Sequence, residues 1–153
     1  MIVVVAIAAA VALLDAITKA WALNLPAEGV SLLPVLDFRL GFNRGISFGM
    51  FSEASGPGAR LALVVLPALI AAGVVLWAVN IADPWERAGF SLIAGGAIGN
   101  VVDRLPDGLV TDFIDMHAGG WHFPTFNLAD VAITAGGGPV CISLGGRECV
   151  LAF

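Results

Sequence analysis

The sequence predicts a membrane all-α fold, with four transmembrane helices and a small extramembrane β platform between the first and second helices. Composition is the first reason: of the 153 residues, 59% are hydrophobic and 12% are charged, against about 45–50% and about 25% in an average soluble domain. The second reason is that apolar residues gather in four segments, each near the length of about 20 residues that crosses a bilayer as a helix. The length suits one domain, residues 1–153.

The first predicted span covers about residues 1–23, "MIVVVAIAAAVALLDAITKAWAL". A cleaved signal peptide starts with a basic n-region. This segment has none, and its apolar run continues past Asp15 and Lys19. We therefore expect the segment to be retained as a helix. Asp15 and Lys19 are four residues apart, a spacing that suits an ion pair on one helix face.

The next connection, about residues 24–57, carries prolines and alternating apolar residues in "SLLPVLDFRLGF", which predict short strands outside the membrane. The second span, about residues 61–82, has no charge, and Pro67 is expected to bend this helix without ending it. The third span, about residues 86–103, follows the short "DPWE" turn, so the two helices should be antiparallel neighbours. Gly95 and Gly99 in "GGAIG" form a GxxxG pattern that favours close helix packing.

A second long connection, about residues 104–125, leads to the fourth span, about residues 126–150. Both long connections should then lie on one side of the membrane, opposite both termini. The segment "ITAGGGPVCISLGGRECVLAF" is poor in helix formers, since Gly costs about 1 kcal/mol and Pro about 3 kcal/mol in a soluble helix interior. We expect a less regular helix beyond Thr134. Cys141 and Cys149 lack a CxxC spacing, so neither a metal site nor a disulfide is expected.

Acidic residues cluster around the second long connection. The cluster consists of Asp103, Asp107, Asp112, Asp115 and Asp130. Asp107, in "LPDGL", is typical of a solvated turn. Asp112 and Asp115 would point to opposite faces of a strand but share one face of a helix, so the pattern does not choose between them. Asp130 opens the fourth span, where Asn127 can cap the helix, and an acid at membrane depth is costly enough to be a functional candidate.

Two acids brought together in a low-dielectric site share one proton, because both cannot ionise easily. The ionised member can deprotonate a water molecule, and the protonated member can polarise a carbonyl group. This is aspartic-protease chemistry, and it needs no metal. A metal site from His117 and His122 is the alternative that the same region allows. The net charge of −5 gives no basic footprint for nucleic acid.

Four blocks of the sequence together resemble the lipoprotein signal peptidase (signal peptidase II) family. They are "DAITK" (15–19), "FNRGISFGMF" (42–51), "GGAIGNVVDRLPDGLVTDFID" (95–115) and "FPTFNLADVAI" (123–133). Their order and spacing also match. The resemblance implies an aspartic endopeptidase that removes signal peptides from diacylglyceryl-modified prolipoproteins, cutting just before the lipidated cysteine.

The resemblance also implies the roles of individual residues. It assigns Asp112 and Asp130 as the catalytic pair, and so chooses Asp112 over Asp115. The expected substrate-binding residues are Asn43, Asn100, Arg104, Asn127, Asp15 and Lys19. No metal and no other cofactor is implied.

The family places the enzyme in the bacterial cytoplasmic (inner) membrane as a multi-pass protein, with both termini in the cytoplasm and the active site near the outer (periplasmic) face. We expect a monomer that contacts membrane lipid and is inhibited by globomycin-type compounds. The glycine-rich end departs from the regular fourth helix and basic tail of the family. A transporter or a proton relay, with Asp130 and Arg104 binding an ion, would spread polar residues through several spans, whereas the second span has no charged residue. A structural subunit would not need clustered acids.

Overall fold

The computed structural model describes residues 1–43 and 57–143, which form four helices and a four-stranded antiparallel sheet. In chain order the elements are α1 (Ile2–Ala22), β1 (Val30–Leu33), β2 (Leu36–Asn43), α2 (Pro57–Ala78), α3 (Pro84–Asp107), β3 (Val110–Ala118), β4 (Trp121–His122) and α4 (Leu128–Ser143). Most of the block "FNRGISFGMF" and the end of the predicted fourth span lie outside the described residues.

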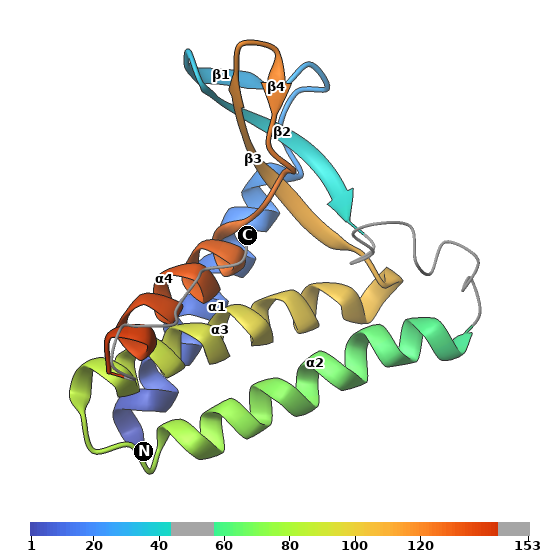
Figure 1. The fold of residues 1–153 in the computed structure, drawn as a ribbon. Coiled ribbons are helices and arrows are strands. Elements are labelled where there is room, and N and C mark those ends of the chain that lie inside the picture. The colour runs from blue at the N-terminus through green and yellow to red at the C-terminus, as the bar shows by residue number, and fades with distance from the viewer. Residues whose placement is uncertain (44–56, 144–153) are drawn as a thin grey trace.

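Helix α3 is the centre of the helical part, because it packs against α1, α2 and α4. The sheet lies at one end of these helices (Figure 1), and the N-terminus and the α2–α3 turn lie at the other end. The turn fits its sequence. Asp83 caps α3 by accepting the Glu86 N–H at 2.8 Å, and Pro84 occupies the first turn, where its missing N–H costs nothing.

The described helices have the surface of a membrane protein. Two of them, Ile2–Ala22 and Leu61–Ala78, are long and apolar enough to cross a bilayer. Leu69 and Trp77 of α2 are 64% and 66% exposed, so large apolar side chains face outward. Helix α2 continues through Pro67, as expected. The apolar part of α4, Leu128–Ile142, is shorter than a full span.

Small residues on α3 allow its neighbours to approach closely. A Cβ atom on Gly95 would lie 2.7 Å from Val11 Cβ of α1, and one on Gly99 would lie 2.6 Å from Asp15 Oδ2. Gly96 lies against the carbonyl oxygen of Ala129 in α4. The close packing expected from the GxxxG pattern is therefore confirmed, and it extends to a second helix.

The sheet differs from the expected platform between the first two helices. Its order is β1-β2-β3-β4, so two strands come from each long connection. Strand β2 pairs with β3, which places Gly41 opposite Asp112 and Asn43 opposite Val110. The expectation missed the pairing of β3 with β2 because it joins segments about 70 residues apart. It also missed β4, which pairs with β3 through a hairpin at Gly119 and Gly120, where both glycines have a positive φ.

The expectation of a less regular helix beyond Thr134 is wrong as far as Ser143. Helix α4 continues through its three glycines and Pro139. Gly136 packs against the backbone of Gly89 in α3, where a side chain would collide, so close packing offsets the poor helix propensity. The expectation that the cysteines form no disulfide is also wrong, because Cys141 is disulfide-bonded.

Candidate active site

Strand β3 places the two alternative acids in different surroundings. Asp112 is 1% exposed, and its Oδ1 accepts a hydrogen bond from Asn127 Nδ2 at 2.7 Å. Asp115 instead lies 2.9 Å from His122 Nδ1 and 3.9 Å from Arg39 Nε. The strand geometry therefore separates the two acids, as the sequence pattern predicted for a strand.

The first turn of α4 places Asp130 beside Asn127. Asn127 Oδ1 accepts the Asp130 N–H at 3.0 Å, and Asp130 Oδ2 accepts the Asn127 N–H at 3.2 Å. This reciprocal arrangement is a capping box, which satisfies two backbone donors at a helix start. The expected cap at Asn127 is confirmed, and it holds the Asp130 carboxylate at the N-terminus of α4, where the helix dipole favours negative charge.

Asn127 joins the two acids into one hydrogen-bonded cluster. Its side-chain amide donates to Asp112 and also to Asn100 Oδ1, the latter at 3.1 Å. Asn100 Nδ2 in turn donates to Asp130 Oδ1 at 2.9 Å. The structure therefore brings Asp112, Asp130, Asn100 and Asn127 together from β3, α4 and α3.

The environment of Asp112 favours its protonated form. Burial raises the pKa of the Asp112 carboxyl from 3.8 to about 6, and the nearby Asp130 carboxylate adds to the rise. Hydrogen bonding to Asn127 and Asn43, and the charge of Lys19, act in the opposite direction. Among the described residues, Asp112 Oδ2 is buried and has no hydrogen-bond partner. A carboxyl in this position can hold a proton near neutral pH.

Asp15 and Lys19 lie behind the acids, at the contact between α1 and α3. They are 1% and 4% exposed, and the Lys19 Nζ atom lies 2.7 Å from Asp15 Oδ2. The ion pair suggested by their spacing is confirmed. Lys19 also donates to Asn100 Oδ1 at 2.9 Å, so this pair is joined to the cluster that contains the acids.

Arg104 and Asn43 complete the set of predicted site residues. Arg104 Nη1 donates to the backbone oxygen of Asn100 at 3.1 Å, while its Nε is buried without a hydrogen-bond partner among the described residues. Asn43 ends β2 and interacts with Asp112. Both residues therefore lie at the same end of the helices as the acids.

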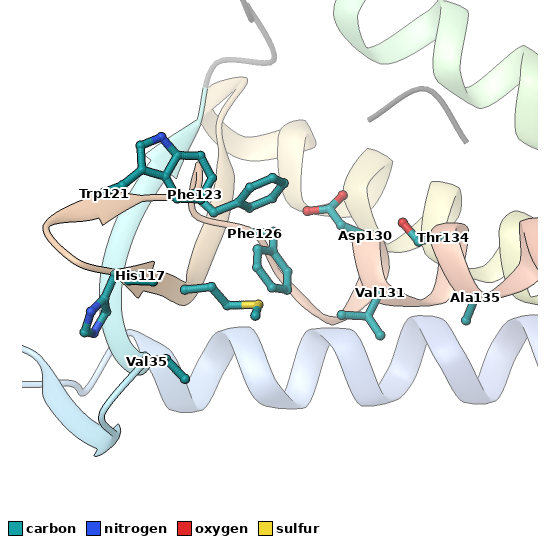
Figure 2. A pocket seen from close by; sticks show the side chains of 11 residues that line it. Val35, His117, Trp121, Phe123, Phe126, Asp130, Val131, Thr134 and Ala135 are labelled. Carbon is teal, nitrogen blue, oxygen red and sulfur yellow. The ribbon is translucent and has the colours of Figure 1, made fainter. Parts of the chain in front are cut away.

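A large groove opens beside Asp130. Its volume is about 660 Å³. Figure 2 shows Asp130, Val131, Thr134 and Ala135 of α4 on one side, and aromatic side chains that include Phe123 on the other. The lining residues are Val35, Met116, His117, Ala118, Trp121, Phe123, Phe126, Asp130, Val131, Thr134 and Ala135. This lining is almost entirely apolar, so the groove suits an apolar ligand that reaches a carboxylate at Asp130.

The two histidines take part in separate acid–histidine pairs. His117 Nε2 lies 3.2 Å from Asp37 Oδ2, and His122 pairs with Asp115. Within residues 1–43 and 57–143, no group of three or more His, Cys, Asp or Glu side chains is arranged to hold a metal ion. Asp107, by contrast, is exposed as expected and accepts the Leu109 N–H at 2.9 Å, but it is the last residue of α3 and not a turn residue.

Sequence reasoning did not identify two parts of this site. Asp103 accepts the Thr111 N–H at 2.6 Å and lies 3.3 Å from the Lys19 ammonium. Asp103 belongs to the acidic cluster visible in the sequence, but the sequence does not indicate these partners. The groove was also missed, although the aromatic run "WHFPTF" between the acids was a visible signal of an apolar surface.

Comparisons with known proteins place the chain in a family. A family model described as signal peptidase (SPase) II matches residues 7–144. Lipoprotein signal peptidase of Hydrogenovibrio crunogenus is 39% identical over 127 residues, covering 80% of this chain and 73% of the relative. That of Aquifex aeolicus is 40% identical over 130 residues, covering 85% and 78%.

Two solved structures of bacterial membrane enzymes resemble the fold of this chain. One bacterial membrane enzyme has a TM-score of 0.78 at 28% identity, covering 94% of this chain and 88% of the other. A second has a TM-score of 0.79 at 26% identity, covering 94% and 93%.

Proposed function

The chain belongs to the signal peptidase II family, whose members remove signal peptides from lipoproteins, and on this premise we propose that it is an aspartic endopeptidase with Asp112 and Asp130 as its catalytic pair. The substrate is a diacylglyceryl-modified prolipoprotein, and the bond cleaved is the one just before the lipidated cysteine. The observation that carries the proposal is that Asn127 links the two acids. Its side-chain amide donates to Asp112. Its backbone N–H donates to the Asp130 carboxylate, and its amide oxygen accepts the Asp130 N–H.

The chemistry needs one proton shared between two acids. The raised pKa of Asp112 supports placing this proton on Asp112 in the free enzyme, which leaves Asp130 as the base. Asp130 takes a proton from water as the water oxygen bonds to the peptide carbonyl carbon, and Asp112 donates its proton to the carbonyl oxygen. The carbon–nitrogen bond then breaks as a proton passes to the leaving amine, and the pair again holds one proton.

Binding of substrate is assigned to the polar side chains around the pair and to the groove. Asn43, Asn100, Asn127 and Arg104 position the peptide near the acids, and the buried Arg104 Nε is a donor that a substrate oxygen can accept. The apolar groove beside Asp130 receives an apolar part of the substrate. Asp15 and Lys19 were expected to bind substrate too, but their burial behind the acids favours an indirect role.

The membrane arrangement is part of the same proposal. All four helices span the bacterial inner membrane, with both termini in the cytoplasm and the sheet and acid pair near the periplasmic face. The outward-facing apolar side chains of α1 and α2 support this placement. The lipidated substrate then enters sideways from the bilayer, with its acyl chains remaining in lipid.

The test is cleavage of a purified diacylglyceryl-modified prolipoprotein in detergent, followed by gel shift, with and without globomycin. Asp112→Asn and Asp130→Asn should each lower the rate on the order of 10³-fold or more, because the two acids act as a unit. Asp107→Asn removes an exposed acid at the end of α3 and should cleave like the wild type.

A wild-type rate in either Asn variant would refute the catalytic pair. Equal cleavage of the unmodified precursor would leave the pair intact but refute the assigned substrate class.

A further inference from the structure

The ammonium group of Lys19 is buried and lies close to three side-chain oxygens of the protein. Lys19 is the one lysine in the sequence. Its Nζ atom lies 2.7 Å from Asp15 Oδ2, 2.9 Å from Asn100 Oδ1 and 3.3 Å from Asp103 Oδ2. Lys19 therefore donates one hydrogen bond, to Asn100, and forms ion pairs with the Asp15 and Asp103 carboxylates. Nothing in this arrangement requires contact with substrate.

The first partner, Asp15, reaches the residue before Asp130. Its Oδ1 accepts the Ala129 N–H at 2.9 Å, a contact between α1 and the first turn of α4. Ala129 N–H is one of the donors that a helix leaves unsatisfied at its start. Asp15 therefore fixes the α4 backbone directly next to Asp130, and Lys19 holds Asp15 in place.

The second partner, Asp103, reaches the residue before Asp112. Its Oδ2 accepts the Thr111 N–H at 2.6 Å. The two carboxylates thus act alike on separate elements, because each binds the backbone N–H immediately before one of the two acids.

The third partner, Asn100, touches the pair itself. Its amide oxygen accepts from Lys19 and from Asn127, so its Nδ2 is turned toward Asp130 Oδ1. Because an ammonium can only donate, Lys19 selects this orientation of the amide over the reverse one.

We propose that Lys19 is a positioning residue that sets the separation and orientation of Asp112 and Asp130, acting through Asp15, Asp103 and Asn100. This role rests on the proposed catalytic pair. Buried charges are costly, and an apolar group of similar volume is often as stabilising. A lysine whose three partners converge on both acids has a geometric reason to be retained.

The competing reading is an ion pair that only ties α1 to α3. That reading predicts lower stability after substitution, with normal kinetics in the folded fraction. Positioning predicts a loss in kcat with little change in KM, because the interaction matters only for reacting geometry. The charge of Lys19 also lowers the pKa of Asp112, so its removal should move the pH profile, which an ion pair acting on stability alone would not do.

The experiment compares Lys19→Met with the wild type on the lipidated prolipoprotein. We expect kcat to fall on the order of 10- to 100-fold, with KM within about twofold. The alkaline limb of the kcat/KM profile should move to higher pH. Asp130 of α4 and Arg104 of α3 are charged groups that remain near Asp112 in this variant.

Arg87→Met is the matched control, since Arg87 donates to a backbone oxygen at the far α2–α3 turn. This variant should have lower stability and an unchanged pH profile of kcat/KM.

Asp103→Asn gives a second, milder test, because the amide oxygen can still accept the Thr111 N–H while the ion pair with Lys19 is lost. It should lower kcat on the order of tenfold. In the Lys19→Met background the same change should add little, since contacting residues in one network are not additive. If Lys19→Met does not fold, Asp103→Asn alone decides.

Wild-type kcat and an unmoved pH limb in the folded variants would overturn the positioning role. Failure of the wild-type enzyme to cleave the prolipoprotein would instead overturn the proposed function, so the two failures are distinguishable.

Discussion

Asp112 is a buried acid, and the described part of the protein provides a hydrogen-bond donor to only one of its two carboxylate oxygens. One carboxylate oxygen has Asn127 as a donor, while the other has no hydrogen-bond partner among the described residues. Desolvation therefore prevails, and the pKa of Asp112 rises to about 6. The proton that the proposed mechanism assigns to Asp112 is thus retained at a pH where an exposed aspartate would have lost it.

The raised pKa of Asp112 predicts the pH dependence of cleavage. Below about pH 6 Asp112 keeps its proton, and above about pH 6 that proton is lost. The kcat/KM of the free enzyme should therefore decline above about pH 6, with an apparent pKa that belongs to the coupled pair. Initial rates of cleavage in detergent, from about pH 5 to about pH 9, would measure this decline in kcat/KM. A flat profile through this range would contradict the assignment of the proton.

At the scale of residues, the sequence could predict which acids were candidates but not their partners. Asp130 stands out because apolar residues surround it, and Asn127 is visible as its cap. Only the resemblance to the signal peptidase II family distinguished Asp112 from Asp115 as the candidate acid. In the structure both acids lie on β3, three residues apart, so their side chains point to opposite faces of the strand. The contact of Lys19 with Asn100 spans 81 positions. It depends on how α1 and α3 pack, and no local pattern encodes it.

At the scale of elements, α3 is shaped by glycines that face two different helices. Gly95 and Gly99 lie against α1, and Gly96 lies against the Ala129 carbonyl, one residue before Asp130. Helix packing and the acid pair are therefore linked through the same backbone contact. Small residues at such interfaces replace the hydrophobic drive that is missing between helices in lipid.

This packing predicts opposite effects for two Gly→Ala substitutions. Gly96→Ala should destabilise the protein by about 1–3 kcal/mol or more, because the new methyl group collides with the α4 backbone. Gly73→Ala is the matched control on α2, where an added Cβ meets nothing within 4 Å; it should be neutral or stabilise by up to about 1 kcal/mol. Thermal unfolding in detergent would measure both. Equal stability of the two variants would refute the close α3–α4 contact.

Most helices could be predicted from apolar length and turn chemistry, but α4 shows the limit. Propensity alone predicted that its glycines would weaken the helix. Gly136 instead fits against Gly89, so the residue that is poor for an isolated helix is suited to this interface. The sequence contains the glycines but does not say which of them have a neighbour.

At the scale of the whole molecule, the sheet and the α2–α3 turn lie at opposite ends of the helices (Figure 1). The sheet could not be predicted in full, because β2 and β3 belong to different connections and pair only once the helices are assembled. Its location beside the acids follows from β3, which carries Asp112 within the sheet.

The arrangement of ends predicts which positions face each side of the membrane. In a background without native cysteines, Ala118→Cys at the end of β3 should react with a membrane-impermeant maleimide on intact cells. Trp85→Cys, at a side chain that is 75% exposed beside the α2–α3 turn, should react only after permeabilisation. Labelling of both positions on intact cells would contradict the four-span topology.

The bond from Asp15 to Ala129 joins positions that are 114 residues apart, and this separation has a consequence for biosynthesis. At a synthesis rate of roughly 5–20 residues per second, α1 emerges roughly 6 to 23 seconds before Ala129. During that interval Asp15 and Lys19 can neutralise each other within one helix, which eases entry into the bilayer. The acids themselves cannot be aligned until α4 docks. With Asp112 and Asp130 as the proposed catalytic pair, a nascent chain therefore gains proteolytic activity only when α4 is in place.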